Sequence, residues 1–174
     1  MENNLKFYSF FAVLNNPKSN GYDYESPSRI LEQIISDWTT DNLHRSIALS
    51  YCISADTKTP HIHAIFEDIK SHTFSEMKTL LPSWHLQPTK GANAEDYIYK
   101  RGSFSESGEQ IICTNSYGVI KGKNAGNSLS IIREMLDRGQ LHELLKIVKP
   151  GYHGINRYIA EQEKLSNVNQ ATIQ

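Results

Sequence analysis

The segment Pro60–Phe66 constrains the fold most, because it reads as a β-strand that carries two histidines on one face. Side chains of a strand alternate between its faces, so His61 and His63 point the same way, while Ile62 and Ala64 point toward a core. The two histidine backbones are about 6.6–7 Å apart along such a strand. Two imidazoles at that separation can converge on one metal ion. A polar strand face without any ligand fits the same short pattern.

The segments around this strand predict an α+β fold, a central antiparallel sheet with flanking helices. Runs of β-branched and aromatic residues predict strands at Phe7–Leu14, Ser46–Ile53, Trp84–Pro88 and Glu109–Cys113. Apolar periodicity and capping residues predict helices at Ser28–Trp38, Phe74–Leu81 and Asn93–Gly102. This order of elements is typical of an antiparallel sheet with its helices on one side.

The chain of 174 residues is long enough for one main domain with a small appendage. Glycine, asparagine and lysine are frequent in residues 114–127, which predicts a linker after a domain of residues 1–113. Short apolar-faced segments in 128–165 predict a small C-terminal α-helical region, and the polar residues 166–174 predict a disordered tail.

The net charge and the spacing of the cysteines limit the kinds of binding site that the chain can carry. The formal net charge of −1 gives no global basic field for nucleic acid, so such binding needs a local patch or a metal. Cys52 and Cys113 lie far apart in sequence, which predicts buried free thiols and excludes a zinc knuckle. Neither a signal-peptide pattern nor an apolar run long enough to span a membrane is visible, which predicts a soluble intracellular protein.

A candidate nucleophile lies on the predicted helix that follows Lys90. Tyr97 and Lys100 are three residues apart and share a helix face. An ordinary phenol, with a pKa of about 10, is a poor nucleophile at neutral pH; a metal on the electrophile and a nearby ammonium would address both difficulties. Tyr99 lies about 200° around the helix from Tyr97, so only one of the two can face the metal, and Lys100 favours Tyr97. Packing of the tyrosines against the sheet, with an Asp96–Lys100 pair on the surface, is the alternative.

Three blocks occur in a set order: Phe11–Pro17, Pro60–His63 and Tyr97–Lys100. Together they resemble the three rolling-circle motifs of HUH-type replication initiators, the Rep proteins of circular single-stranded DNA viruses such as circoviruses and geminiviruses and of related bacterial plasmids. The segment His85–Gly91 is also similar to the residues before the tyrosine motif of circovirus Reps. The resemblance covers roughly the first two-thirds of the chain.

This resemblance implies a metal-dependent DNA endonuclease and strand transferase. His61 and His63 would hold Mg²⁺ or Mn²⁺, Tyr97 would attack the scissile phosphate to leave a 5′-phosphotyrosine, and Lys100 would steady charge beside the phosphate. The substrate would be single-stranded DNA at an origin stem-loop. The sequence leaves two alternatives: a single-tyrosine relaxase or transposase, and a non-enzymatic nucleic-acid-binding module.

The family usually adds a third, carboxylate ligand from the strand before the hairpin turn, but Ile47–Ile53 contains no acid. Asp56 is the nearest carboxylate and is our candidate third ligand, although an aspartate that simply forms the turn fits equally well. Glu67 is on the histidine face but roughly 13 Å beyond His63 along the strand, too far to ligate.

DNA-contact residues are carried over from the same resemblance. The first motif, which belongs to DNA recognition in the family, holds Asn15, Asn16 and Lys18, and Lys90 and Arg101 are candidates for phosphate contacts. A plain Asn-Asn-Pro turn and isolated surface charges are the alternatives.

The helical tail resembles the oligomerisation region that follows the nuclease in those Reps and predicts a homo-oligomer. No G-x-x-x-x-G-K-[ST] motif occurs in the chain, so a helicase would come from a missing domain or another protein. A plasmid-encoded protein would be cytoplasmic, and a viral one would act in the host nucleus.

Overall fold

The computed structural model describes residues 5–40, 44–91, 94–122, 135–136 and 138–139. The chain divides into two compact units, Met1–Gly126 and Asn127–Gln174. The predicted helical region and tail fall almost entirely outside the described residues, so the predictions of a homo-oligomer and of a disordered tail stay predictions. Within the described residues, no helix combines the length and apolar character needed to cross a membrane.

The first unit is built on one five-stranded antiparallel sheet, which confirms the predicted α+β class. Its strands are β1 (Lys6–Asn15), β2 (Ser46–Ile53), β3 (Pro60–Thr73), β4 (His85–Pro88) and β5 (Gln110–Tyr117). Their spatial order is β4-β1-β3-β2-β5, so the histidine strand β3 lies in the middle of the sheet. β5 reaches Tyr117, so the residues from Thr114 that begin the predicted linker instead pair with β2.

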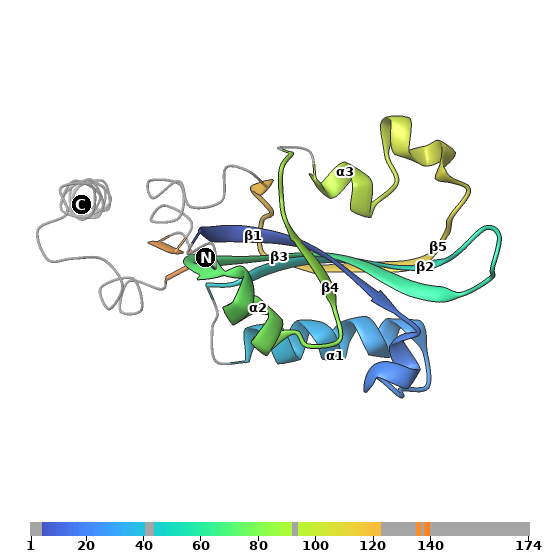
Figure 1. The fold of residues 1–174 in the computed structure, drawn as a ribbon, viewed down its shortest axis with the longest axis horizontal. Coiled ribbons are helices and arrows are strands. Elements are labelled where there is room, and N and C mark those ends of the chain that lie inside the picture. Colours follow the sequence, from blue (N-terminus) through green and yellow to red (C-terminus); the bar gives the residue numbers. More distant parts are fainter. Residues whose placement is uncertain (1–4, 41–43, 92–93, 123–134, 137, 140–174) are drawn as a thin grey trace, which may run out of the picture. The chain divides into compact units, whose positions relative to one another are not determined.

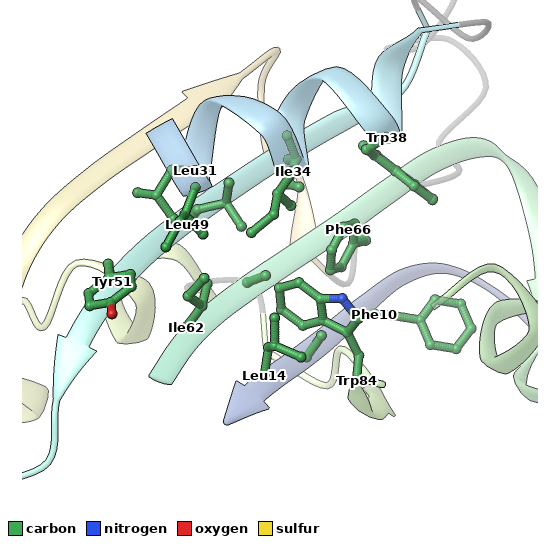
Figure 2. Close-up of a cluster of buried hydrophobic side chains, with 14 of the residues drawn as sticks. Phe10, Leu14, Leu31, Ile34, Trp38, Leu49, Tyr51, Ile62, Phe66 and Trp84 are labelled. Atoms are coloured by element: carbon green, nitrogen blue, oxygen red, sulfur yellow. The ribbon is translucent and has the colours of Figure 1, made fainter. Parts of the chain in front are cut away.

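One face of the sheet is covered by α1 (Pro27–Thr39) and α2 (Phe74–Leu80) (Figure 1). Both helices are capped by side chains: the Ser26 hydroxyl accepts from the Arg29 backbone N–H, and Thr73 forms a capping box. The apolar side of α1 packs on the inward residues of β1, β2 and β3 (Figure 2). The centre is aromatic, since the Phe66 ring lies 5.0 Å from both Trp38 and Trp84.

α3 (Ala94–Ile98) lies on the opposite face of the sheet, where Ile98 packs against Ala48 and Ile65 (Figure 1). The prediction that the helices share one side was therefore wrong. The predicted helix also ends at Ile98 and not at Gly102. Two short 3₁₀ helices complete this unit's described elements, η1 (Pro17–Asn20) after β1 and η2 (Gly102–Ser107) after α3.

Candidate metal and tyrosine site

The two histidines of β3 face each other on the α3 side of the sheet. Their Nε2 atoms are 3.1 Å apart, and both residues are buried, with exposed fractions of 6% and 4%. The alternation that sends His61 and His63 to this face sends Ile62 and Ala64 into the core on the other. This confirms the prediction that His61 and His63 share one face of the strand.

Glu109 supplies the carboxylate of the site. Its Oε1 lies 3.3 Å from His61 Nε2, and its Oε2 lies 3.2 Å from His63 Nε2. Glu109 directly precedes β5, and it reaches the histidines because β5 pairs with β2, which pairs in turn with β3. Gly108 makes the approach possible: its φ is +71°, and a Cβ there would lie 3.3 Å from Ala55 Cβ.

Cys52 is the fourth member of the cluster. It pairs in register with His61 across the β2–β3 hairpin, so the two side chains lie next to each other on one face. Ligand atoms of Cys52, His61, His63 and Glu109 all lie within 4.8 Å of one another. These four residues, which we call the metal cluster, could bind a metal ion whose identity the geometry does not fix.

The hydrogen bonds around the histidines fit a bound cation. His61 Nδ1 lies 3.2 Å from the Thr59 carbonyl oxygen, which can only accept, so Nδ1 carries the proton and Nε2 offers its lone pair. His63 Nδ1 is buried and has no hydrogen-bond partner in the described part of the chain. The Nε2 atoms of both histidines and the Glu109 carboxylate lie close together, so one cation could contact all three groups at once.

The charge states also suit metal ligation. Burial, reinforced by the nearby Lys100 ammonium, lowers the pKa of His63 to about 4, so its imidazole is neutral at pH 7. Partial burial acts to raise the pKa of Glu109, but Lys100 and the two histidines together outweigh burial, and the pKa lies below its ordinary value. A neutral His63 imidazole beside the Glu109 carboxylate matches the protonation states that a metal requires of these two ligands. Cys52 is the exception: burial raises the pKa of its thiol, so this residue ligates only if the metal displaces its proton.

Lys100 joins the metal cluster to the tyrosine. Its Nζ lies 2.6 Å from Glu109 Oε2 and 3.8 Å from the centre of the Tyr97 ring, and the residue is buried. A buried ammonium needs such partners, because an uncompensated charge is expensive away from water.

The backbone at Lys100 adopts a conformation that lysine rarely takes. Its φ is +49°, and it ends α3 in a Schellman arrangement, with the Arg101 N–H donating to the Asp96 carbonyl and the Lys100 N–H to the Tyr97 carbonyl. Glycine is the usual residue at this position. This turn ends α3 earlier than predicted. It also places the Lys100 ammonium beside Glu109, whereas the spacing had predicted a contact between Lys100 and Tyr97 along one helix face.

Tyr97 packs directly against the cluster. Its ring centre lies 5.2 Å from the His63 ring, 5.1 Å from Phe11 and 5.3 Å from Phe104, each in an edge-to-face arrangement. Tyr99 points elsewhere, packing against the small cluster of Ala48, Ile65 and Ile98. Of the two competing tyrosines, Tyr97 is therefore the one beside the histidines.

A pocket of about 650 Å³ opens on the other side of Tyr97. Aromatic and basic side chains contribute to its lining, among them Phe11, Phe104, Lys90 and Arg101. Both basic residues are exposed, as contacts with a ligand in solution require. The predicted phosphate-contact residues thus lie beside the predicted nucleophile.

The residues of the first motif lie at the histidine end of β1. Asn15 pairs in register with His61, and the Asn16 N–H donates to the Pro60 carbonyl at 2.9 Å. Asn15, Asn16 and Lys18 are all exposed. The first two motifs are therefore neighbours in space although far apart in sequence.

The third ligand differs from the sequence prediction. Asp56 is exposed in the β2–β3 turn, outside the metal cluster, and Glu109 takes the place of the carboxylate. The sequence signal for Glu109 was weak: it is one acid at the edge of a predicted strand, and 46 residues separate it from His63. Glu67 is used elsewhere, accepting from the Ser9 hydroxyl and from the backbone of Lys121 and Gly122.

Comparisons of the chain with models of known protein families and with curated protein sequences gave no match.

Proposed function

We propose that this chain nicks and rejoins single-stranded DNA at a replication origin through a covalent tyrosine intermediate, with a divalent metal at the cluster. The observation that carries this proposal is the packing of Tyr97 against His63, with Lys100 between the ring and Glu109. A metal site, a phenol and a cation within one small volume are the parts that phosphoryl transfer to a tyrosine needs.

Mg²⁺ or Mn²⁺ is the cation that fits the proposal. His61, His63 and Glu109 would hold it, because two imidazoles and one carboxylate leave further coordination positions open. When bound, such a cation supplies Lewis acidity that polarises a phosphate oxygen.

The residues of the chain itself carry out the nucleophilic attack and stabilise the charge. Tyr97 Oη forms a bond to phosphorus as the bond from phosphorus to the 3′ oxygen breaks; the phenol releases its proton to solvent, and the leaving oxygen takes one up as a 3′-OH. The Lys100 ammonium, 3.8 Å from the ring centre, places a positive charge beside the nucleophile and the reacting phosphate. Rejoining follows the same steps in reverse, with the 3′-OH attacking the phosphotyrosine.

Single-stranded DNA suits the surroundings of Tyr97. Unpaired bases stack on aromatic side chains, and basic residues contact the phosphates between them. The pocket beside Tyr97 combines Phe11 and Phe104 with Lys90 and Arg101. Asp96 also lines this pocket, so the two basic residues give it a small local excess of positive charge in a chain whose net charge is −1.

A denaturing gel with an origin stem-loop oligonucleotide tests the proposal. Wild-type protein with Mn²⁺ or Mg²⁺ should form a retarded covalent protein–DNA band, and Tyr97→Phe should form none, because phenylalanine has no oxygen to bond phosphorus. Tyr99→Phe is the matched control and should retain the band, since Tyr99 packs away from the histidines.

Three outcomes would count against parts of this proposal. A band that persists in Tyr97→Phe and disappears in Tyr99→Phe would identify the other tyrosine as nucleophile. Undiminished cleavage by His61→Ala would remove the metal from the mechanism. DNA binding without cleavage under any divalent metal would favour the non-enzymatic binding module.

A further inference from the structure

One member of the metal cluster, Cys52, has no task in the proposed nicking reaction. Its Sγ lies within 4.8 Å of the ligand atoms of His61, His63 and Glu109, on the strand position directly opposite His61. The thiol is fully buried and contacts the Ser50 hydroxyl at 3.5 Å, a weak hydrogen bond. A thiol held this close to three other ligands is positioned as a fourth ligand.

The four side chains supply all the ligands that a tetrahedral metal ion needs, but too few for a metal ion with a higher coordination number. Zn²⁺ is bound tetrahedrally by thiolate, imidazole and carboxylate, and four protein ligands close its coordination sphere. Mg²⁺ and Mn²⁺ prefer oxygen ligands and higher coordination numbers, and they gain little from a thiol. The same cluster therefore presents four ligands to a thiophilic cation and three to a hard one.

We propose that Cys52 makes the cluster discriminate between metals: Zn²⁺ and other thiophilic divalent cations bind through Cys52, His61, His63 and Glu109, whereas Mg²⁺ and Mn²⁺ leave the thiol out. On zinc binding, the Cys52 thiol releases its proton to solvent and a metal–sulfur bond forms. The zinc-filled cluster is a closed site.

A consequence for activity rests on the proposed function. A closed four-coordinate site leaves no position for a phosphate oxygen, so Zn²⁺ occupies the cluster without supporting nicking and competes with Mn²⁺. Sulfur ligation itself does not depend on that function and is measured without DNA.

Co²⁺ substitution in the full chain tests the proposal, because Co²⁺ adopts zinc-like sites and a bound thiolate gives it a charge-transfer absorption. Wild-type protein should show this band, and Cys52→Ser should lose it. Cys113→Ser is the matched control: it removes the other cysteine, which is half-buried on β5 and packs on the core side of the sheet, and it should keep the band.

Affinities measured by competition with a chelating dye complete the test. Cys52→Ser should lower Zn²⁺ affinity about 10–100-fold and change Mn²⁺ affinity by less than about 3-fold. Cys52→Ala repeats the measurement without a hydroxyl, and circular dichroism verifies that each variant is folded.

Two results would overturn the inference: a Co²⁺-loaded wild type with no thiolate band, or equal losses of Zn²⁺ and Mn²⁺ affinity in Cys52→Ser. Either would leave the phosphotyrosine assay unaffected. Conversely, a failed phosphotyrosine assay with an intact thiolate band would remove the proposed function and leave the zinc site standing.

Discussion

The two faces of the sheet differ in what they bury. The face under α1 buries apolar and aromatic side chains, with Phe66 between Trp38 and Trp84 (Figure 2). The face under α3 buries two imidazoles, a thiol and an ammonium beside a small apolar cluster of Ala48, Ile65 and Ile98. Both faces are formed by the same strands, and successive residues of a strand point to opposite faces. This alternation separates the large apolar core from the cluster that could bind a metal.

The two faces also differ in backbone strain. The α1 face uses a helix with a standard cap and a long apolar side. The α3 face uses a five-residue helix that ends in a lysine with positive φ. Strained backbone and buried polar groups are tolerated where the rest of the structure holds them in place. The large core on one face therefore supports the costly arrangement on the other.

The largest stability effect should come from the core face. Phe66→Ala removes a fully buried ring from between two tryptophans and should lower the free energy of unfolding by about 3–5 kcal/mol. Chemical denaturation measures this loss. Phe74→Ala, which truncates a phenylalanine that is 45% exposed on α2, is the control and should change stability far less. A similar small change for Phe66→Ala would mean that the α1 face is not the main source of stability.

The buried carboxylate of Asp68, in the second half of β3, should make the stability of the fold depend on pH, with an effect of intermediate size. Asp68 is buried and contacts Arg45 at 2.8 Å, His72 at 3.0 Å and His44 at 3.4 Å. Burial alone would raise the pKa of Asp68, but these hydrogen bonds outweigh it and hold the pKa well below its ordinary value. The stability this carboxylate contributes is therefore fully present above its unfolded-state pKa of about 3.9, and it is lost as the pH falls toward the folded-state pKa.

Asp68→Asn should lower stability at pH 7 by about 2–3 kcal/mol and flatten the loss of stability below about pH 4. Urea denaturation at a series of pH values measures both effects. Asp56→Asn, on an exposed turn carboxylate, is the matched control and should leave the wild-type profile intact. An unchanged acid profile in Asp68→Asn would show that the Asp68 contacts are not maintained in solution.

The smallest predicted effect is the energetic cost of the positive φ at Lys100, on the α3 face. Lys100→Gly and Lys100→Ala both remove the ammonium that pairs with Glu109, and they differ mainly in how readily residue 100 adopts a φ of +49°. The glycine variant should be more stable than the alanine variant by about 1 kcal/mol. Thermal unfolding of the two variants compares them. Equal stabilities would show that the positive φ carries no cost.

Much of this molecule follows from local sequence. The alternation in β3 and the caps of α1 and α2 are short-range properties, and they predicted the strands, two of the helices and the shared face of His61 and His63. The Tyr97–Lys100 spacing also predicted that these side chains meet, although they do so through a turn and not along a helix face. Asp56 was the candidate third ligand because sequence reasoning favours the nearest acid.

The sequence by itself determined which residues alternate between strand faces, where two of the helices begin and that His61 and His63 share a face, because these depend on neighbours within a few positions. Only the tertiary structure decided that Glu109 and Cys52 join the histidines and that α3 lies on the opposite face from α1. The reason is strand pairing: the register between β5, β2 and β3 brings distant residues to one end of the sheet, and that register depends on the fold as a whole.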